Sequence, residues 1–448
     1  MRRYLYPLLL TGFLGAVGYI LFFHKPDSIP RLQPRRGDLT LGGEWTNVQQ
    51  AVEGLLAELR ANPDNTKARL QLAQAYIQEG RVTGNHGYYD AAALDLLEEV
   101  LRLDPSNFEA LCCQATVLLS QHHFTEALQV AHGAQRLNPH NSYIYGLLCD
   151  AYLELGNYAE AVRMADKMVS VRPDLRSYAR VSYLREIHGD MPGAIEAMKL
   201  AVSAGYPGLE QTAWTQIQLG RLYEISGDLS DATALYERAL AERPRYPFAL
   251  AGLGRVAAAQ KRYREAINYL TAARRAQPDF TFAEELSDVY RQVGQADSAR
   301  RCAEDVVKSL AGVSGGDEDN PGHGHYADRE LAYAYLKVGK PAKALEHALI
   351  EYERRPDNID VQEVTAWAYY HNGQYGKAQQ LIRRALRTNS QSPALRCRAG
   401  LIAVKAGDRT GGLALLRQAL ERNPYLEPAL AGPARRYLKG APQVAVAR

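Results

Sequence analysis

The sequence predicts an all-α protein, a solenoid in which one helix–turn–helix unit is repeated along the chain. The first observation is a period of 34 residues, which separates Pro244 from Pro278 and Ala232 from Ala266. The second is that a small residue is followed twelve positions later by proline at eight places in phase. The third is that no segment shows the alternating apolar pattern of a strand. The eight pairs are Ala51–Pro63, Ala93–Pro105, Ala127–Pro139, Ala161–Pro173, Ala232–Pro244, Ala266–Pro278, Ala344–Pro356 and Gly412–Pro424.

Each residue type in this period has a physical reason. Small residues let two antiparallel helices approach closely, a large residue fills the gap left for it, and proline ends the second helix. One copy within residues 213–278 reads Leu219, Gly220, Tyr223, Gly227, Ala232, Tyr236, Ala239 and Pro244. These residues resemble the tetratricopeptide repeat (TPR). The resemblance covers residues 46–437 and implies a right-handed α-α superhelical solenoid of about ten units that winds through more than one turn.

Residues 1–25 are predicted to form an N-terminal signal-anchor. Residues 4–23 carry no charge, and a transmembrane helix of this length would rise about 30 Å, which matches the hydrocarbon core of a bilayer. A cleaved signal peptide, giving a secreted protein, is the alternative, but no small-x-small site precedes Lys25. Basic residues nearly balance across the segment. Since a short basic tail rarely crosses a membrane, we expect the solenoid to face the periplasm or outside, and a cytosolic orientation stays open.

The rest of the chain is read in order. Residues 26–45 contain three prolines and no apolar period, so they are predicted to be a linker. The solenoid starts at residue 46 with a lone second helix that covers its open end. The turn at residues 81–89 is long and is expected to protrude. An insertion loop is predicted at 312–325, and residues 438–448 are predicted to be a disordered tail.

Composition and motifs argue against an enzyme. The net charge of +3 is too small to indicate a nucleic-acid partner. The five cysteines have no Cys-x-x-Cys spacing and fall in predicted helices, where they act as small apolar residues. No metal-binding or phosphate-binding motif occurs, so we expect no cofactor and no small-molecule substrate. The adjacent His122 and His123 are interpreted as a polar surface pair.

The resemblance implies that the concave face, lined by the first helix of each unit, is the binding surface for peptides or protein partners. Arg221 and Arg255 fall at equivalent positions of successive units, where they could bind a carboxylate or an acidic peptide. Aromatic residues near the end of the array could anchor a partner's side chain. An alternative interpretation is that the arginines pair with neighbouring glutamates and the rings shield helix interfaces. The predicted groove residues are Tyr183, Trp214, Arg221, Arg255, Asp288, Arg291, Tyr333, Trp367 and Tyr370.

The expected function is therefore that of a membrane-tethered TPR scaffold or adaptor, most consistent with a bacterial envelope assembly. The anchor would concentrate binding at a membrane surface. An organelle-surface receptor with a cytosolic array is the alternative, and the substrate-binding part of an enzyme is a third possibility. Little room remains for a catalytic domain, because nearly all of the chain outside the anchor belongs to the array.

Overall fold

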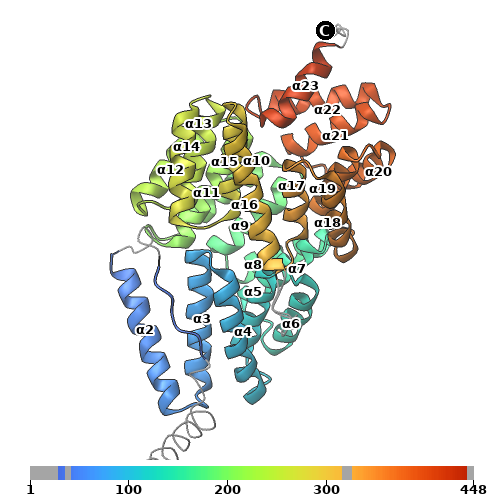
Figure 1. The fold of residues 1–448 in the computed structure, drawn as a ribbon. Coiled ribbons are helices and arrows are strands. Elements are labelled where there is room, and N and C mark those ends of the chain that lie inside the picture. The colour runs from blue at the N-terminus through green and yellow to red at the C-terminus, as the bar shows by residue number, and fades with distance from the viewer. Residues whose placement is uncertain (1–28, 36–41, 315–324, 441–448) are drawn as a thin grey trace, which may run out of the picture. The chain divides into compact units, whose positions relative to one another are not determined.

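The computed structural model describes residues 29–35, 42–314 and 325–440 (Figure 1), and within these residues every regular element is a helix. Residues 35–448 form one compact unit, separate from residues 1–34, and all contacts discussed below lie in the former. The first half contains α2 (Gly42–Ala61), α3 (Thr66–Thr83), α4 (His86–Leu103), α5 (Phe108–Ser120), α6 (Phe124–Leu137), α7 (Ser142–Glu154), α8 (Tyr158–Val171), α9 (Leu175–Ile187), α10 (Met191–Ser203), α11 (Glu210–Ile225) and α12 (Leu229–Glu242). The second half contains α13 (Pro247–Ala259), α14 (Tyr263–Ala276), α15 (Phe280–Gln292), α16 (Ala296–Ser314), α17 (Asp328–Lys337), α18 (Pro341–Arg354), α19 (Ile359–His371), α20 (Tyr375–Ala385), α21 (Pro393–Lys405), α22 (Arg409–Arg422) and α23 (Pro428–Lys439).

These helices form ten antiparallel pairs, from α3–α4 to α21–α22, with α2 and α23 at the two ends. Local sequence sets their limits. The side chain of Asn65 accepts a hydrogen bond from the Ala68 amide, and Asp174 and Ser177 form a reciprocal capping box at the start of α9. Pro247 occupies the first position of α13, where its missing N–H costs no helical hydrogen bond. Short-range chemistry therefore divides the chain into the hairpins that the period predicts.

Close packing within and between pairs depends on the repeated small residues. Tyr236 is fully buried between Gly220 of α11 and Gly252 of α13. A Cβ atom built on Gly220 would lie 2.5 Å from the tyrosine ring, and one on Gly252 would lie 2.6 Å from it. The aromatic ring thus occupies the space that the two glycines leave open, as the sequence period indicates.

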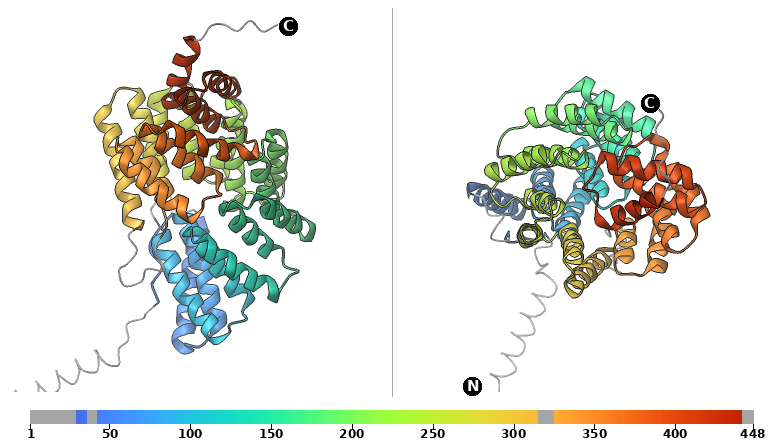
Figure 2. Two further views of the ribbon diagram at one scale, coloured as in Figure 1. Left: turned by 90° about the vertical axis from the view of Figure 1, so that its right-hand side faces the viewer. Right: turned by 90° about the horizontal axis from the view of Figure 1, so that it is seen from above.

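The first helix of each pair lies on the inside of the curve. Successive first helices such as α5 and α7, α11 and α13, and α17 and α19 approach one another, whereas successive second helices approach much less. Figure 2 (right) shows the resulting ring of hairpins viewed from above. We call the surface formed by the first helices the inner face.

Successive turns of this coil touch one another. Five connections between the helices of a pair and the start of α2 lie against six connections between pairs one turn later. The first set is near Glu44 (in α2), Gly84, Gln121, Glu154, Gly189 and Gly227, and the second is near Arg243, Gln277, Tyr326, Asn358, Asn389 and Pro424. The hydrogen bonds between them join residues 199 to 205 positions apart, which corresponds to about six units of 34 residues. We call this set of contacts the turn-to-turn interface.

Both polar and steric features make the turn-to-turn interface specific. Arg355 Nη1 lies 2.6 Å from Glu154 Oε2, and the amide of Ile359 donates to Tyr158 Oη over 2.8 Å. Gly156 has φ +82° and approaches the next turn so closely that an added Cβ atom would lie 2.2 Å from the carbonyl carbon of Asp357. Only glycine satisfies both the backbone conformation and the space at this position.

Two interpretations from the sequence are wrong. The turn at residues 81–89 does not protrude, because α3 continues to Thr83 and α4 begins at His86, so the extra residues lengthen the helices. His122 and His123 are not a surface pair. His123 is 5% exposed and stacks on Tyr326, and His122 Nδ1 lies 2.7 Å from the Tyr326 carbonyl oxygen.

Several predicted boundaries fall at or beyond the limits of the described residues. No helix in the described part of the chain is long and apolar enough to cross a membrane, and the predicted anchor at residues 4–23 lies outside that part. Most of the predicted loop (315–324 of 312–325) and of the predicted tail (441–448 of 438–448) also lies outside it. Helix α2 begins at Gly42, inside the predicted linker, and α16 continues to Ser314.

Candidate functional site

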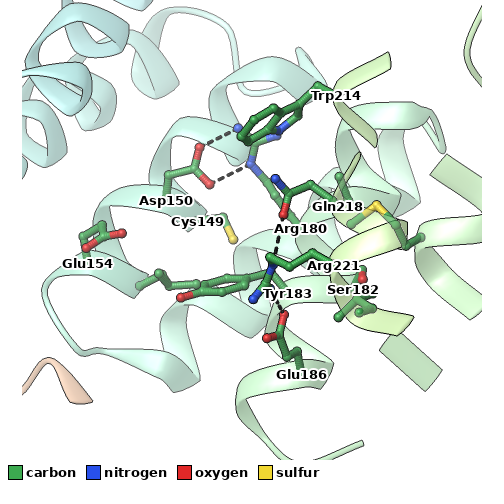
Figure 3. Close-up of a pocket in the computed structure, with 14 residues that line it drawn as sticks. Cys149, Asp150, Glu154, Arg180, Ser182, Tyr183, Glu186, Trp214, Gln218 and Arg221 are labelled. Carbon is green, nitrogen blue, oxygen red and sulfur yellow. Dashed lines mark hydrogen bonds and ion pairs between the residues drawn. The ribbon is translucent and has the colours of Figure 1, made fainter. Parts of the chain in front are cut away.

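A cavity of about 290 Å³ opens on the inner face between α7, α9 and α11 (Figure 3). Two ion pairs cross it. Arg180 binds Asp150, with Nε 2.8 Å from Oδ1, and Arg221 Nη2 lies 2.5 Å from Glu186 Oε2. Its lining residues are Cys149, Asp150, Leu153, Glu154, Ala179, Arg180, Ser182, Tyr183, Glu186, Met198, Trp214, Gln218, Arg221 and Leu222.

These two ion pairs belong to a series that follows the inner face through the remaining units. Residues of opposite charge on neighbouring first helices pair with each other. In four of the six pairs the basic residue follows the acidic one by 30 to 35 positions, in one it follows by 49, and in one it precedes it by 31. The spacing follows from the repeat, because equivalent positions on successive first helices face one another. We call this series the ion-pair ladder, and its members are Asp150–Arg180, Glu186–Arg221, Glu224–Arg255, Asp288–Lys337, Asp360–Arg329 and Glu363–Arg398.

The ladder determines the environment of the predicted groove residues that carry charge. Arg221 pairs with Glu186, and Arg255 lies 3.0 Å from both Glu224 and Glu285. Both guanidinium groups therefore have carboxylate partners. This agrees with the alternative interpretation of the sequence, in which the arginines pair with neighbouring glutamates. Asp288 accepts a hydrogen bond from Lys337 Nζ over 2.6 Å, and half-exposed Arg291 lies 3.7 Å from Asp288.

The predicted aromatic residues separate into two places. Tyr183 and Trp214 line the cavity of the inner face. Trp367 and Tyr370 stack with their ring centroids 4.7 Å apart, and both pack against the core of the last units. Tyr333 does not join that stack directly. Arg398 lies over both Tyr333 and Trp367, at 5.3 and 5.9 Å from the ring centroids, and so connects the two.

Several arginines of the inner face and its edge are shared between two carboxylates. Three of them lie between carboxylates that have no second ion pair among the described residues, and we call these the doubly paired arginines. They are Arg255 (Glu224 and Glu285), Arg329 (Glu330 and Asp360) and Arg398 (Glu363 and Glu427). The excess of negative charge is visible in two side chains. Burial, together with the neighbouring Glu224 and Glu284, raises the pKa of Glu285 to about 7 despite Arg255. The pKa of Tyr183 is raised well above its usual value by Asp360 and by burial.

We expect the raised pKa of Glu285 to make the free energy of unfolding depend on pH. A carboxyl whose pKa is higher in the folded state stabilises the fold below the unfolded pKa, near 4.5, and this contribution is lost as pH rises toward 7. Glu285→Gln should therefore gain stability relative to the unmodified protein between pH 5 and pH 8, as measured by urea unfolding.

Glu330→Gln is the matched control. Arg329 lowers the pKa of Glu330 to about 2 against the effect of burial, so its contribution changes only below pH 4.5. The stability difference between Glu330→Gln and the unmodified protein should stay constant from pH 5 to pH 8. A constant difference for Glu285→Gln as well would contradict the raised pKa.

A larger cavity, of about 880 Å³, lies where α4 faces α13, α15 and the end of α16 across the turn-to-turn interface. Trp214 lines both cavities, so the larger one adjoins the first on the inner face. Its lining combines aromatic and charged side chains. These residues are Arg81, Gly84, His86, Gly87, Asp90, Ala91, Asp95, Gln121, Glu210, Trp214, Phe248, Gln277, Pro278, Asp279, Phe280, Ser309, Leu310, Gly312 and His325.

Sequence reasoning missed Arg180 and, apart from Trp214 and Phe248, which the register places on the inner face, the residues of the larger cavity. Arg180 follows the inner-face residue Asp150 by 30 positions, so a search for oppositely charged residues one unit apart would have found it. The larger cavity has no such signature, because residues about 200 positions apart form it. Among the described residues no group of three or more His, Cys, Asp and Glu side chains is arranged to hold a metal ion.

Comparison with known families gives an independent assignment of the fold. Two family models, both described as tetratricopeptide repeat, match residues 118–186 and 225–284 and residues 46–107 and 329–393, together more than half of the chain. The chain belongs to the tetratricopeptide repeat family. TPR domains are protein-interaction scaffolds that bind protein or peptide partners. The search of curated proteins found no match.

Two solved structures are similar to this TPR protein in fold. A structure described as human IFIT1 dimer with PPP-AAAA is 14% identical, covers 83% of this chain and 90% of its own, and has a TM-score of 0.44. The yeast Tom70 crystal structure is 10% identical, covers 88% of this chain and 92% of its own, and has a TM-score of 0.36.

Proposed function

We propose that this TPR protein is a non-enzymatic scaffold that binds an extended or helical segment of a protein partner on its inner face. The observation that supports the proposal best is the pair of adjoining cavities at Trp214. Concave sites with an apolar wall and a few fixed polar groups are the usual form of a binding site. The ion-pair ladder would keep the first helices in fixed positions, so that little ordering of the scaffold opposes binding.

Site-specific photo-crosslinking from the full chain in cells tests this proposal. A benzophenone amino acid replaces Gln218 in the first cavity, or exposed Glu237 on the outer helix α12 as the matched control. We expect a discrete crosslinked protein partner from position 218 and none of the same mass from position 237. Crosslinking of a partner from position 237 alone would contradict binding on the inner face.

We propose further that residues 4–23 tether the scaffold to a membrane, in a bacterial envelope assembly with the repeats outside the cytoplasm. The uncharged run of 20 residues supports the tether, and the short basic tail ahead of it supports the orientation. Membrane fractionation tests the tether, and recovery of the protein with the soluble fraction would contradict it. Protease treatment of intact and permeabilised cells tests the orientation. Repeats that stay protected until the cytoplasmic membrane is permeabilised would lie in the cytoplasm and would contradict the proposed orientation.

A further inference from the structure

The charge of the inner face points away from the acidic ligand that Arg221 and Arg255 suggest in the sequence. Each of these arginines is already neutralised by carboxylates. Each of the doubly paired arginines, Arg255, Arg329 and Arg398, is outnumbered by its two carboxylates, which leaves local negative charge beside it. A segment with the opposite charge would be attracted to this face, and an acidic one would be repelled.

The larger cavity repeats this imbalance among the residues that line it. Arg81 Nε lies 3.0 Å from Glu210, so these two charges compensate each other. His86 lies 3.4 Å from the buried Asp90, which also accepts a hydrogen bond from Ser120. Burial, followed by the effect of nearby His122, lowers the pKa of His325 to about 4, so this imidazole is neutral at pH 7.

Two carboxylates of the cavity have no ion pair among the described residues, although Asp279, like Asp90, lies near enough to His86 to raise the pKa of that imidazole against the effect of burial. Asp95 is exposed on α4 and has no hydrogen bond or ion pair among the described residues. Asp279 accepts two hydrogen bonds from Thr281 through its Oδ1 atom, and its Oδ2 atom has no such partner in the same part of the chain. The cavity therefore lacks about one or two positive charges that a ligand could supply.

Part of the cavity wall is aromatic. Trp214 and Phe248 meet edge to face with centroids 5.2 Å apart, and Phe280 lies beside them in the lining. Both Trp214 and Phe248 are only partly buried. A planar guanidinium group stacks well on such rings, and its aliphatic stem suits the apolar surface around Leu310.

We propose that the partner segment is basic, and that one of its arginine or lysine side chains enters the larger cavity, against the aromatic wall and near the carboxylates of Asp95 and Asp279. The inference rests on the proposed function, because it names the chemistry of the segment that the inner face binds. The rest of the segment would follow the first cavity and the doubly paired arginines, where its other basic residues meet the surplus carboxylates.

Fluorescence anisotropy with the detergent-solubilised full chain tests the inference. The probe is a labelled peptide of four Arg-Gly-Ser repeats, compared with the same peptide carrying citrulline in place of arginine and with one carrying glutamate. We expect binding of the arginine peptide, at least about tenfold weaker binding of the citrulline peptide and no binding of the glutamate peptide. Tighter binding of the glutamate or citrulline peptide would overturn the proposal.

Variants locate the binding and exclude a general charge effect. Asp95→Asn with Asp279→Asn removes both charges but keeps the amide oxygen that can cap α15, and it should weaken the arginine peptide about tenfold. Phe248→Leu should weaken it severalfold, more for arginine than for the citrulline peptide. The control Glu53→Gln with Glu237→Gln neutralises two exposed outer carboxylates and should leave binding unchanged. Equal losses in the cavity variant and the control would overturn the site.

Two further outcomes separate this inference from the function on which it rests. Loss of arginine-peptide binding while a partner still crosslinks from position 218 would overturn the basic ligand and leave the scaffold function standing. Absence of both would overturn the two together. Competition by spermine equal to that by an unlabelled arginine peptide of the same charge would assign the cavity to small polyamines and overturn a peptide ligand.

Discussion

Tyr236→Ala is expected to lower the free energy of unfolding by about 3–5 kcal/mol. The ring is fully buried and fills the gap between Gly220 and Gly252, so its removal leaves a cavity bounded by two helix backbones. The substitution also removes the hydrogen bond of 2.8 Å that Tyr236 Oη donates to Glu224, a residue of the ion-pair ladder. Urea unfolding followed by circular dichroism measures the loss.

Tyr236→Phe is the matched control, because it keeps the ring and removes only the hydroxyl group. Its cost should be about 1–2 kcal/mol, the contribution of a hydrogen bond to a charged acceptor. A loss of that size for both variants would show that the ring does not maintain the packing of α11 and α13. Equal and large losses would instead attribute the effect to the hydroxyl group.

Arg355→Met is expected to destabilise the turn-to-turn interface by about 3–5 kcal/mol. Arg355 is 3% exposed, bonds to Glu351 and Glu154, and lies 4.5 Å from the centroid of the Phe124 ring. Methionine can fill much of the same volume. However, it leaves Glu351, which is 2% exposed, as a buried charge that has lost one of its two arginine partners. Thermal unfolding measures the loss of stability. In the same variant, hydrogen exchange of the Tyr326 and Ile359 amides, which donate hydrogen bonds across the interface, should be faster than in the unmodified protein.

A double variant shows whether the loss arises from that charge. Adding Glu351→Gln to Arg355→Met removes the buried carboxylate, and we expect it to restore at least half of the lost stability. Arg384→Met, whose guanidinium is half exposed and 3.2 Å from Asp357, should cost less than about 1 kcal/mol. No recovery in the double variant, together with unchanged hydrogen exchange, would contradict an interface held by Arg355.

The repeat could be predicted because its information is local. Glycine and alanine at fixed offsets, and residues such as Tyr236 that fill the space beside them, specify each hairpin within 34 positions. The turn-to-turn interface could not be predicted in this way. Whether two turns touch depends on small rotations and translations between neighbouring units that accumulate over six units, and no local sequence pattern specifies their sum. The local sequence around His122 is therefore typical of a surface turn, although the side chain contacts Tyr326, which is 204 positions later in the chain.

The candidate site could be predicted only in part. The inner-face register identified Tyr183, Trp214 and Arg221, which the structure brings together in one cavity. It did not show that Arg221 and Arg255 already have carboxylate partners, because each partner lies on a neighbouring first helix. The function of these residues in binding remains a prediction that the crosslinking and anisotropy experiments test.

Contact between windings changes the mechanics of the array. In an open repeat protein each unit contacts only its immediate neighbours, so the end units can unfold separately and the array can extend under force. Here Asn423, in the last connection of the array, is bonded to the Glu224 carbonyl six units upstream. Pulling or trimming the C-terminus should therefore loosen the middle of the molecule as well, so that it yields as a single block rather than one hairpin at a time.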